Sequence, residues 1–312
     1  MTQNTDRIIF KAIEDGVINE ITCFPIDNID KLRGFHNWIK SKLIENAKNH
    51  TLNNKINIDI SDKNFNEPNK FRSGLKLLDV AVGRAGDLHK WSRFGVKFVT
   101  GIDSDKNSIY GEDGAIKRVN SVKHIKTCPK CCFWNISAID PKVLEKINGK
   151  DRGMLYDIVS CQFAFHYFVK EIDTVLDMIS KKLNPGGFFI GTASNGDLIK
   201  RNLESGDIDT GSLKIKKIND ESYSYELTCN SSERRTYFEI REEVIPEYFL
   251  SPDFLVKKCK EYNLEPINIQ TFHEWKEYYY KTVLSDIIKL SDMATQESIA
   301  SFLNFSFSFV KI

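Results

Sequence analysis

The stretch LLDVAVGRAGDL at residues 77–88 decides how this chain folds. Its apolar beginning predicts a buried strand ending at Val80, and its small residues predict a turn that leads into a helix. Small residues let a ligand approach the backbone where a strand ends. Asp103 closes the next apolar run, and a carboxylate there can accept hydrogen bonds from both ribose hydroxyls of an adenosine cofactor.

Two classes of cofactor fit this turn, and the charges around it favour one of them. The glycine spacing allows a degraded dinucleotide fingerprint. A pyrophosphate would bind at the start of the helix, where Asp79 and Asp87 would repel it. S-adenosylmethionine has no phosphate and carries a sulfonium and an ammonium group, so the two acids favour a methyl donor. Asp87 can equally be an acid that stabilises the first turn of its helix.

Strand-like and helix-like segments alternate from about residue 75 onward. This alternation predicts an α/β fold with a parallel sheet and helices on both faces. The predicted strands are Leu75–Val80, Lys97–Ile102, Tyr156–Cys161 and Gly187–Thr192, and the predicted helices between them are Asp87–Phe94, Ser104–Asn120 and Glu171–Leu183.

Other segments lie outside this alternation. Asp30–Asn49 has apolar residues at three- and four-residue steps, which predicts an amphipathic helix with Asn37 and Lys40 together on another face. Phe305–Phe309 alternates strictly, which predicts a half-buried antiparallel strand near a sheet edge. The stretch Thr210–Ile245 predicts an antiparallel insertion, with strands at Leu213–Ile218, Tyr223–Leu227 and Thr236–Ile240.

Composition and charge exclude several classes of protein. The 312 residues are 41% hydrophobic and 28% charged, ordinary values for a soluble globular protein. The formal charge is only +1, so any contact with nucleic acid must come from a local patch. No apolar run approaches the ~20 residues of a membrane helix, and the N-terminus lacks the pattern of a signal peptide. We therefore expect neither secretion nor a membrane.

The seven cysteines are mostly scattered, which predicts reduced thiols in a cytosol-like compartment. Cys128 and Cys131 form a single CxxC pair. A zinc site needs four ligands, and His124, Cys132 or Cys229 would complete one only through the fold. We therefore predict a loop with free thiols and no metal.

The segment YDIVSCQFAFHY at residues 156–167 is the second informative stretch. Its strand ends at Cys161, so Gln162, His166 and Tyr167 lie past the carboxyl edge of the sheet, where open α/β sheets bind ligands. An imidazole beside a phenol ring suits stacking on, and hydrogen bonding to, a planar base. The alternative is a histidine and a tyrosine that belong to the core.

Six segments in order along the chain resemble motifs of the mRNA cap guanine-N7 methyltransferase family. They are FHNWIKSKLI, LLDVAVGRAGDLHKW, SCQFAFHY, NPGGFFIGTASNGDLI, VIPEYFL and TFHEW, which run from residue 35 to residue 275. The asparagine- and lysine-rich composition resembles the branch found in large cytoplasmic DNA viruses, such as African swine fever virus. In that branch the methyltransferase is often the C-terminal part of a longer capping enzyme.

The resemblance implies a Rossmann-like class I methyltransferase fold that uses S-adenosylmethionine. Its sheet is expected to have seven mostly parallel strands, an antiparallel last strand and an antiparallel substrate-binding insertion. We expect one domain over residues 1–312, with a helical extension at 1–70, a cofactor-binding core at 71–200, a cap-binding insertion at 201–250, and C-terminal helices and strands at 251–312.

The resemblance also implies the residues of two sites. Glu247 suits guanine because a carboxylate can accept hydrogen bonds from N1–H and the exocyclic amine together. Arg84, Lys90 and Arg118 suit the triphosphate bridge of the cap. Without the family, each cation could as well be a solvated surface charge. The predicted cofactor residues are Lys40, Ala81, Gly83, Asp103, Asn135, Gln162 and Tyr167, and the predicted cap residues are Asn37, Arg84, Lys90, Arg118, His166, Tyr167 and Glu247.

The sequence departs from the family pattern at three places. Alanines stand at positions 81 and 85, where the family has glycines. The acid that reads the adenine has no clear match, and Asn135 or Asp140 stands in its place. A late tyrosine is replaced by Asn304, so Phe302 or Phe305 is expected to cover the base.

The implied reaction is transfer of a methyl group from S-adenosylmethionine to N7 of the guanine cap of mRNA. N7 loses no proton on methylation, so we expect positioning and electrostatics rather than an acid or base residue. The implied partners are capped mRNA and RNA triphosphatase and guanylyltransferase domains, in the cytoplasm, or in a viral factory or virion. A methyltransferase for a small molecule or protein, and a non-catalytic subunit of the same fold, remain alternatives.

Overall fold

The computed structural model describes residues 3–27, 29–61, 74–230, 245–282 and 293–312, without the side chains of 52–61. The chain forms two compact units. Unit 1 comprises Met1–Ile39, Thr192–Leu255 and Ile269–Ser306. Unit 2 comprises Lys40–Gly191, Val256–Asn268 and Phe307–Ile312. Each unit is described by itself.

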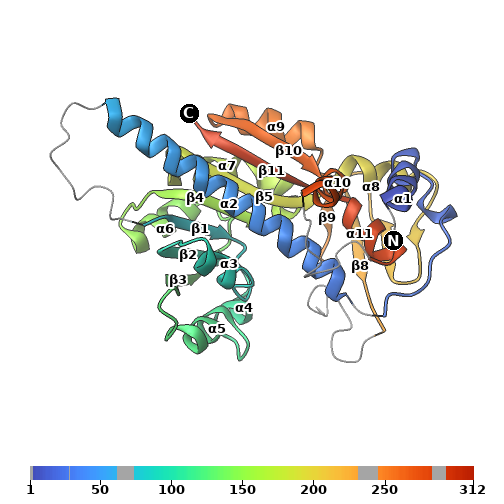
Figure 1. Cartoon of the computed structure of the whole chain (residues 1–312), viewed down its shortest axis with the longest axis horizontal. Coiled ribbons are helices and arrows are strands. Elements are labelled where there is room, and N and C mark those ends of the chain that lie inside the picture. The colour runs from blue at the N-terminus through green and yellow to red at the C-terminus, as the bar shows by residue number, and fades with distance from the viewer. Residues whose placement is uncertain (1–2, 28, 62–73, 231–244, 283–292) are drawn as a thin grey trace. The chain divides into compact units, whose positions relative to one another are not determined.

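A seven-stranded sheet has the order β10-β11-β5-β4-β1-β2-β3 (Figure 1). β1 pairs in parallel with β2 and β4, so Leu78 lies between Thr100 and Val159, and β2 pairs in parallel with β3. The arrows of β10 and β11 point in opposite directions in Figure 1. The strands are β1 Lys76–Val80, β2 Phe98–Asp103, β3 Lys130–Asn135, β4 Tyr156–Gln162, β5 Leu183–Ser194, β10 Leu264–Thr271 and β11 Asn304–Lys311.

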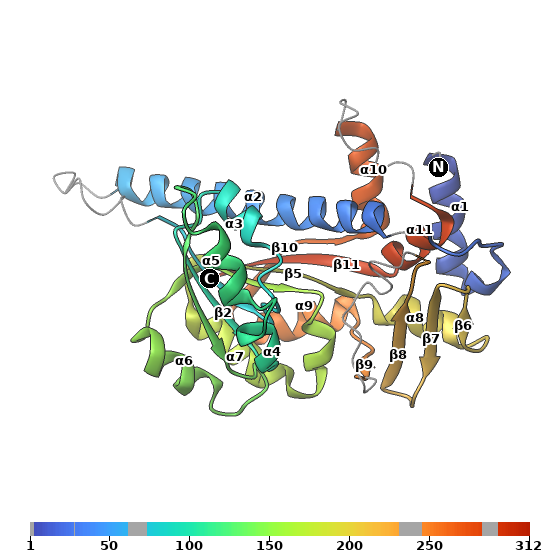
Figure 2. The same ribbon diagram turned by 90° about the horizontal axis from the view of Figure 1, so that it is seen from below.

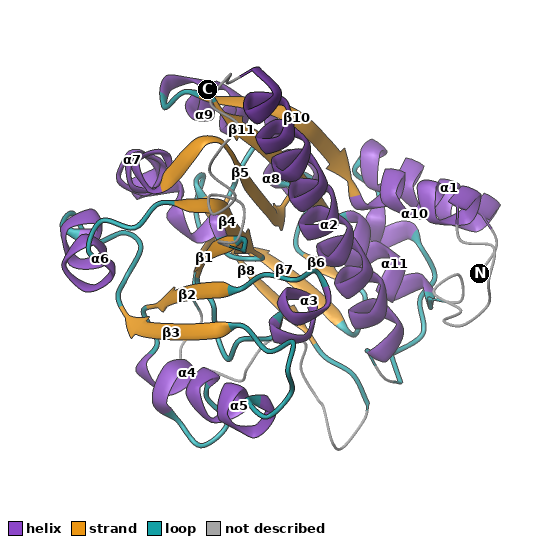
Figure 3. Ribbon diagram, turned by 60° about the vertical axis from the view of Figure 1, so that its left-hand side comes forward, coloured by secondary structure: helices purple, strands orange, loops and turns teal. Residues whose placement is uncertain are grey.

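The helices of unit 2 cover both faces of its parallel strands. Figures 2 and 3 show α6 and α7 on one side of these strands and α3 on the other. The predicted α/β fold with a mostly parallel sheet is therefore confirmed. The helices that lie wholly in this unit are α3 Leu88–Arg93, α4 Lys106–Tyr110, α5 Ala115–Val122, α6 Val143–Asp151, α7 Ile172–Lys182 and the 3-10 helix η3 Phe165–Glu171. Helix α9, Pro252–Glu261, begins in unit 1 and ends in unit 2.

The predicted helix Ser104–Asn120 is wrong as a single element, because two glycines divide it into α4 and α5. Gly111 is extended, with φ −64° and ψ 175°. A Cβ at Gly111 would lie 2.4 Å from the carbonyl oxygen of Asn107. The backbone turns between Gly111 and Gly114, whose N–H donates to the Gly111 carbonyl at 3.0 Å.

The predicted half-burial of Phe305–Phe309 is also wrong, because side chains cover both faces of β11. Phe307 packs against Phe189 with ring centroids 4.9 Å apart. On the serine face, Ser306 Oγ accepts a hydrogen bond from Trp275 Nε1 at 2.8 Å. All residues from 304 to 309 are buried. Alternation of Phe and Ser identified the strand but not what covers its polar face.

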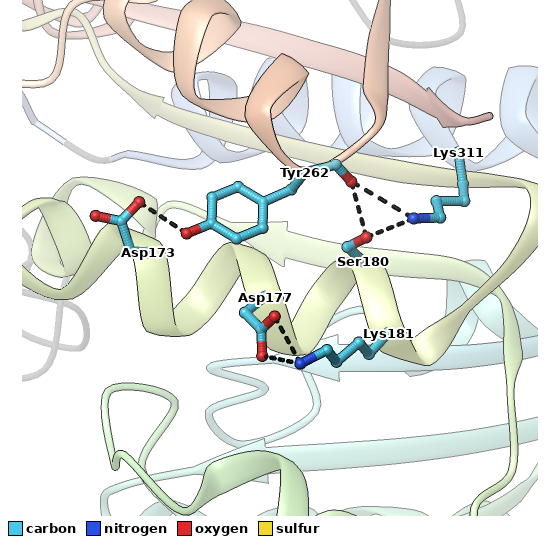
Figure 4. A network of polar contacts seen from close by, with 6 residues as sticks. All are labelled: Asp173, Asp177, Ser180, Lys181, Tyr262 and Lys311. Atoms are coloured by element: carbon cyan, nitrogen blue, oxygen red, sulfur yellow. Dashed lines mark hydrogen bonds and ion pairs between the residues drawn. The ribbon is translucent and has the colours of Figure 1, made fainter.

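A polar network within unit 2 joins α7 to Lys311 of β11 and to Tyr262, which follows α9 (Figure 4). The Lys311 ammonium donates to Ser180 Oγ at 2.6 Å. Ser180 Oγ donates to the Tyr262 carbonyl at 2.8 Å, and the Tyr262 hydroxyl donates to Asp173 at 2.9 Å. These bonds join three chain segments that are far apart in the sequence.

Unit 1 contains the predicted antiparallel insertion, a four-stranded sheet in the order β6-β7-β8-β9. Its strands are β6 Ile208–Asp209, β7 Leu213–Lys217, β8 Ser222–Leu227 and β9 Glu247–Tyr248. The predicted strand Thr236–Ile240 lies outside the described residues. The helices are α1 Gln3–Asp15, η1 Ile18–Glu20, α8 Gly196–Leu203, α10 Phe272–Thr282 and α11 Thr295–Phe302.

Helix α2, Asp30–Ser61, begins in unit 1 and continues into unit 2. It confirms the predicted amphipathic helix and extends it beyond Asn49. Its apolar positions Leu32, Phe35 and Ile39 are fully buried. Within the described residues, no helix combines the length and the apolar character needed to cross a bilayer.

Candidate active site

The turn after β1 holds three residues in the left-handed region of backbone conformation. Ala81 has φ 58°, Gly83 has φ 52° and Ala85 has φ 55°. An L side chain in this region costs about 1–2 kcal/mol, so the two alanines hold the turn under strain. A Cβ at Gly83 would meet no atom within 4 Å, which leaves open space beside the backbone there.

Asp103, at the end of β2, is fixed by this turn. Its Oδ2 accepts the Gly83 N–H at 2.7 Å, and its Oδ1 accepts the Asp105 N–H at 2.8 Å. Each carboxylate oxygen has a second lone-pair direction. The carboxylate is therefore oriented by the backbone at the position where ribose hydroxyls of a nucleoside could donate to it.

Asn135, at the end of β3, lies opposite Asp103 in the register of the sheet. Its side-chain amide donates to the carbonyls of Asp103 at 3.0 Å and Ser104 at 2.9 Å. Asp140, the other residue considered for the adenine, is engaged elsewhere. It pairs with Lys146 and accepts the backbone N–H of Lys142, whereas Asn135 shares the sheet edge with Asp103.

A buried carboxylate bridges two lysines at the start of α3. Asp87 Oδ1 lies 2.8 Å from Lys40 Nζ and 2.8 Å from Lys90 Nζ. Burial alone would raise the pKa of Asp87, but the two ammonium groups outweigh it and hold that pKa far below its ordinary value. Burial lowers the pKa of Lys90, and Asp87 opposes this shift. Lys40 and Lys90, predicted for different ligands, thus share one carboxylate.

Asp79 is a second buried acid beside this group, with a relative exposure of 4%. Burial, with the charge of Asp87 nearby, raises its pKa well above the ordinary value. Lys40 and Lys90 outweigh the charge of Asp87, and the raised pKa of Asp79 favours its neutral form. The charges beside the turn therefore do not by themselves favour a methyl donor over a pyrophosphate, in contrast to the argument from the sequence.

The end of β4 brings together the three residues predicted there. Gln162 Nε2 donates to Ser160 Oγ at 3.2 Å, and Phe163 follows with φ 54°. The rings of His166 and Tyr167 lie 4.4 Å apart at 50°. His166 is only 1% exposed, while Tyr167 is partly exposed, so the phenol is the more accessible ring of the pair.

Two predicted cap cations lie elsewhere in unit 2. Arg84, in the turn after β1, lies 3.7 Å from the carboxylate of Asp113. Arg118 is exposed on α5. Arg84 is thereby connected to the loop that precedes α5.

The remaining predicted cap residues, Asn37 and Glu247, belong to unit 1. Asn37 is exposed on α2. Glu247 lies on β9 opposite Tyr223 on β8 and is 3% exposed. Its Oε2 accepts hydrogen bonds from the Tyr223 hydroxyl at 2.8 Å and from Ser194 Oγ at 3.1 Å. The two donors hold a buried carboxylate in one orientation.

The residues at the position of the late family tyrosine belong to the interior of unit 1. Asn304 donates to the carbonyls of Ala300 and Ser301. Phe302 packs edge-on against Phe10, with centroids 6.2 Å apart. Phe305 is 1% exposed.

A family model described as the mRNA (guanine-N(7))-methyltransferase domain matches residues 25–301. The chain belongs to this family. The matched range contains both the turn after β1 and Glu247, and it confirms the resemblance seen in the six sequence motifs.

Relatives in viruses and animals agree with the family. A probable mRNA-capping enzyme of Acanthamoeba polyphaga mimivirus is 28% identical over 305 residues, which cover 82% of this chain and 23% of the relative. The mRNA cap guanine-N(7) methyltransferase of Caenorhabditis elegans is 31% identical over an alignment that covers 78% of this chain and 60% of the relative. The mRNA cap guanine-N(7) methyltransferase of Drosophila melanogaster is 26% identical over an alignment that covers 80% of this chain and 56% of the relative. The chain thus spans a quarter to three fifths of these relatives.

Sequence reasoning missed the partners of the predicted residues. Tyr223 and Ser194 were not predicted as site residues, although both contact Glu247. Asp87 was considered for its charge near the turn and as a first-turn acid of its helix, but not as the partner of two lysines. The one available signal was the alternation of β8, which places Tyr223 on the same face as Leu227. Among the described residues, the cysteines are free and no group of three or more His, Cys, Asp or Glu residues could hold a metal.

Proposed function

We propose that this domain transfers the methyl group of S-adenosylmethionine to N7 of the guanine cap of mRNA. The observation that carries the proposal is the family match over residues 25–301. The open space at Gly83 and the oriented carboxylate of Asp103 support a cofactor that carries a ribose, as S-adenosylmethionine does. The buried, oriented carboxylate of Glu247 supports recognition of a guanine edge.

In this proposal, side chains of unit 2 hold the donor. Asp103 accepts from the ribose hydroxyls, Lys40 binds the carboxylate of the donor, and the backbone at Ala81 and Gly83 lies against its methionine part. Asn135, Gln162 and Tyr167 complete the site. When bound, S-adenosylmethionine supplies a methyl group activated by its positive sulfur.

The cap is held by polar and charged groups. Glu247 accepts from N1–H and the amine of guanine, and Tyr223 and Ser194 keep its carboxylate aimed. Arg84, Lys90 and Arg118 bind the triphosphate bridge. Asn37, His166 and Tyr167 position the base. N7 carries a free lone pair and loses no proton, so the protein contributes orientation and electrostatic stabilisation rather than proton transfer.

We further propose that the domain acts beside RNA triphosphatase and guanylyltransferase activities, in one chain or one complex, in the cytoplasm of a cell infected by a large DNA virus. The name and length of the mimivirus relative support this proposal. We also propose that the chain divides functionally into a helical extension at 1–70, a cofactor-binding core at 71–200, a cap-binding insertion at 201–250 and C-terminal helices and strands at 251–312.

Thermal unfolding tests the proposal against its two alternatives. A ligand that binds only the folded state raises the melting temperature. We expect S-adenosylmethionine to raise it, and the cap analogue GpppA to raise it further, while ATP does not. Stabilisation by the donor without a GpppA effect would indicate another methyl acceptor. Absence of stabilisation by the donor would indicate a non-catalytic subunit.

A further inference from the structure

Positive charge is concentrated in one segment of unit 2, which lies between Asp113 and Asp140. Between Gly114 and Ile139 the chain has five cations and no carboxylate. The formal charge of +5 in this segment, against +1 for the whole chain, leaves −4 for all other residues. The five cations, which we call the basic strip, are Lys117, Arg118, Lys123, Lys126 and Lys130.

The side chains of the basic strip are available to a ligand. All five are exposed, as is His124 among them. In the part of the chain that the structure describes, none of the five forms an ion pair, whereas lysines elsewhere in unit 2 pair with nearby acids, such as Lys146 with Asp140 and Lys181 with Asp177. Uncompensated exposed cations at this density raise the local potential and attract polyanions.

An ion pair links the segment just before the strip to the candidate active site within unit 2. Arg84 of the cofactor turn contacts Asp113, which precedes Gly114, the N-cap of α5. α5 carries Lys117 and Arg118 and packs beside β3, the outer strand of the sheet, as Figure 3 shows. The strip then continues through the α5–β3 loop to Lys130, at the far end of a strand about 20 Å long.

Apolar and aromatic surface lies among these charges. Ile116 is 37% exposed, Ile125 is 43% exposed and Phe98 is 36% exposed. Lys130 Nζ lies 5.8 Å from the centroid of the Phe98 ring. Proteins that bind single strands combine cations along the backbone with such surfaces for bases and sugars. Binding of an acidic protein would require only the cations and not the apolar and aromatic surface among them.

We infer that the lysines of the basic strip that follow Arg118 in the chain bind the phosphodiester backbone of the single-stranded RNA beyond the cap. The inference rests on the proposed function, because that function brings a capped RNA to the cofactor turn, which Arg84 links to the segment just before the strip. Lys123, Lys126 and Lys130 contact RNA and not the cap, so these three lysines raise affinity for long substrates without changing the methyl-transfer step.

The test compares a capped RNA of about 20 nucleotides with the cap dinucleotide GpppA. The strip variant is Lys123→Ala/Lys126→Ala/Lys130→Ala. The control variant is Lys142→Ala/Lys150→Ala/Lys257→Ala, which removes three exposed lysines from other surfaces of unit 2. RNA affinity is measured by fluorescence polarisation from about 50 to 300 mM salt, the range in which counterion release dominates binding, and methylation by steady-state kinetics.

We expect the strip variant to bind capped and uncapped RNA at least about 10-fold more weakly at 0.15 M salt, with a salt slope smaller by about 2, or 0.7 for each lost contact. KM for capped RNA rises while kcat and all constants for GpppA stay unchanged. The control variant keeps wild-type binding and slope.

Wild-type RNA affinity and slope in the strip variant would overturn the inference. An equal loss on GpppA would also overturn it, because the lysines would then act at the cap or on the fold. So would loss of poly-glutamate binding with RNA binding intact, which would assign the strip to an acidic protein. If wild-type protein methylates neither substrate, the proposed function fails, and the RNA binding measurement still decides the inference.

Discussion

Asp103 is the residue on which donor binding depends most directly, because both of its oxygens are oriented by backbone amides. Asp103→Ala removes two charge-assisted hydrogen bonds to the ribose and should weaken donor binding by about 3 kcal/mol or more. Isothermal titration with S-adenosylmethionine measures this loss, and Asp103→Asn, which keeps one acceptor, should lose less. Unchanged affinity in the alanine variant would remove Asp103 from the site.

Asp87 provides a test of the charge arrangement beside the turn. Asp87→Asn leaves the ammonium groups of Lys40 and Lys90 without their carboxylate, which should lower the free energy of unfolding by about 3–5 kcal/mol at neutral pH. The folded-state pKa of Asp87 is depressed, so its stabilisation is present above the unfolded pKa of about 4 and is lost as pH falls.

Urea unfolding of both proteins between about pH 3 and pH 7 checks this sign. The difference in stability between wild type and Asp87→Asn should shrink as the pH falls below about 4. A difference that stays constant over the whole range would mean that the carboxylate does not stabilise the fold through its charge.

Glu247 and Tyr223 test guanine recognition at the level of single atoms. Glu247→Ala should abolish methylation of capped RNA with donor affinity nearly intact. Tyr223→Phe removes one donor to Oε2 and should lower kcat/KM about 10-fold, since a hydrogen bond to a charged group contributes about 1.5 kcal/mol or more. The preference for guanine over adenine at the cap should narrow in parallel.

Tyr225→Phe, two residues further along β8, is the matched control and should keep wild-type discrimination. Wild-type turnover of GpppA RNA by Glu247→Ala would contradict the assignment of the cap pocket. A Tyr223→Phe protein whose kcat/KM falls equally for guanine and adenine caps would show that Tyr223 supports the fold and not the aim of Glu247.

At the scale of elements, the turn between β1 and α3 holds two alanines, Ala81 and Ala85, in the left-handed region of backbone conformation. Ala81→Gly should raise the free energy of unfolding by about 0.5–1 kcal/mol, because relief of about 1–2 kcal/mol of strain exceeds the added entropy of the unfolded chain. Ala85→Gly should gain nothing, since Ala85 is fully buried and losing its methyl costs about 0.8 kcal/mol.

Chemical denaturation of the two glycine variants measures both values, and each variant serves as the control for the other. Equal stabilisation by the two substitutions would mean that burial of the Ala85 methyl is unimportant. Destabilisation by Ala81→Gly would mean that the left-handed conformation at residue 81 is not strained.

The elements themselves show what the sequence could and could not predict. Strands β1, β2 and β4 were predicted within a residue or two, because each is a short apolar run bounded by turn residues. β5 begins at Leu183, earlier than predicted, because Asn-Pro-Gly-Gly is a typical turn signal that the sheet overrides. The break between α4 and α5 depends on a close approach of Gly111 to Asn107, which periodicity does not reveal.

At the scale of the whole molecule, the predicted site residues divide between the two units. The donor residues, from Lys40 to Tyr167, belong to unit 2, and Asn37 and Glu247 belong to unit 1. Residues near the ends of parallel strands could be predicted because topology brings them to one edge. The contacts of Glu247 with Ser194 and Tyr223 join residues up to 53 positions apart, and a single sequence carries no signal for such pairs.

The central claim is that this chain methylates N7 of a guanine cap, and one measurement tests it most directly. The protein is incubated with GpppA-capped RNA and S-adenosylmethionine labelled in its methyl group, and the labelled position is mapped after nuclease digestion. We expect all label in 7-methylguanine released from the cap, with none on the first transcribed nucleotide or on uncapped RNA. Label at any other position, or no transfer with donor binding intact, would contradict the account.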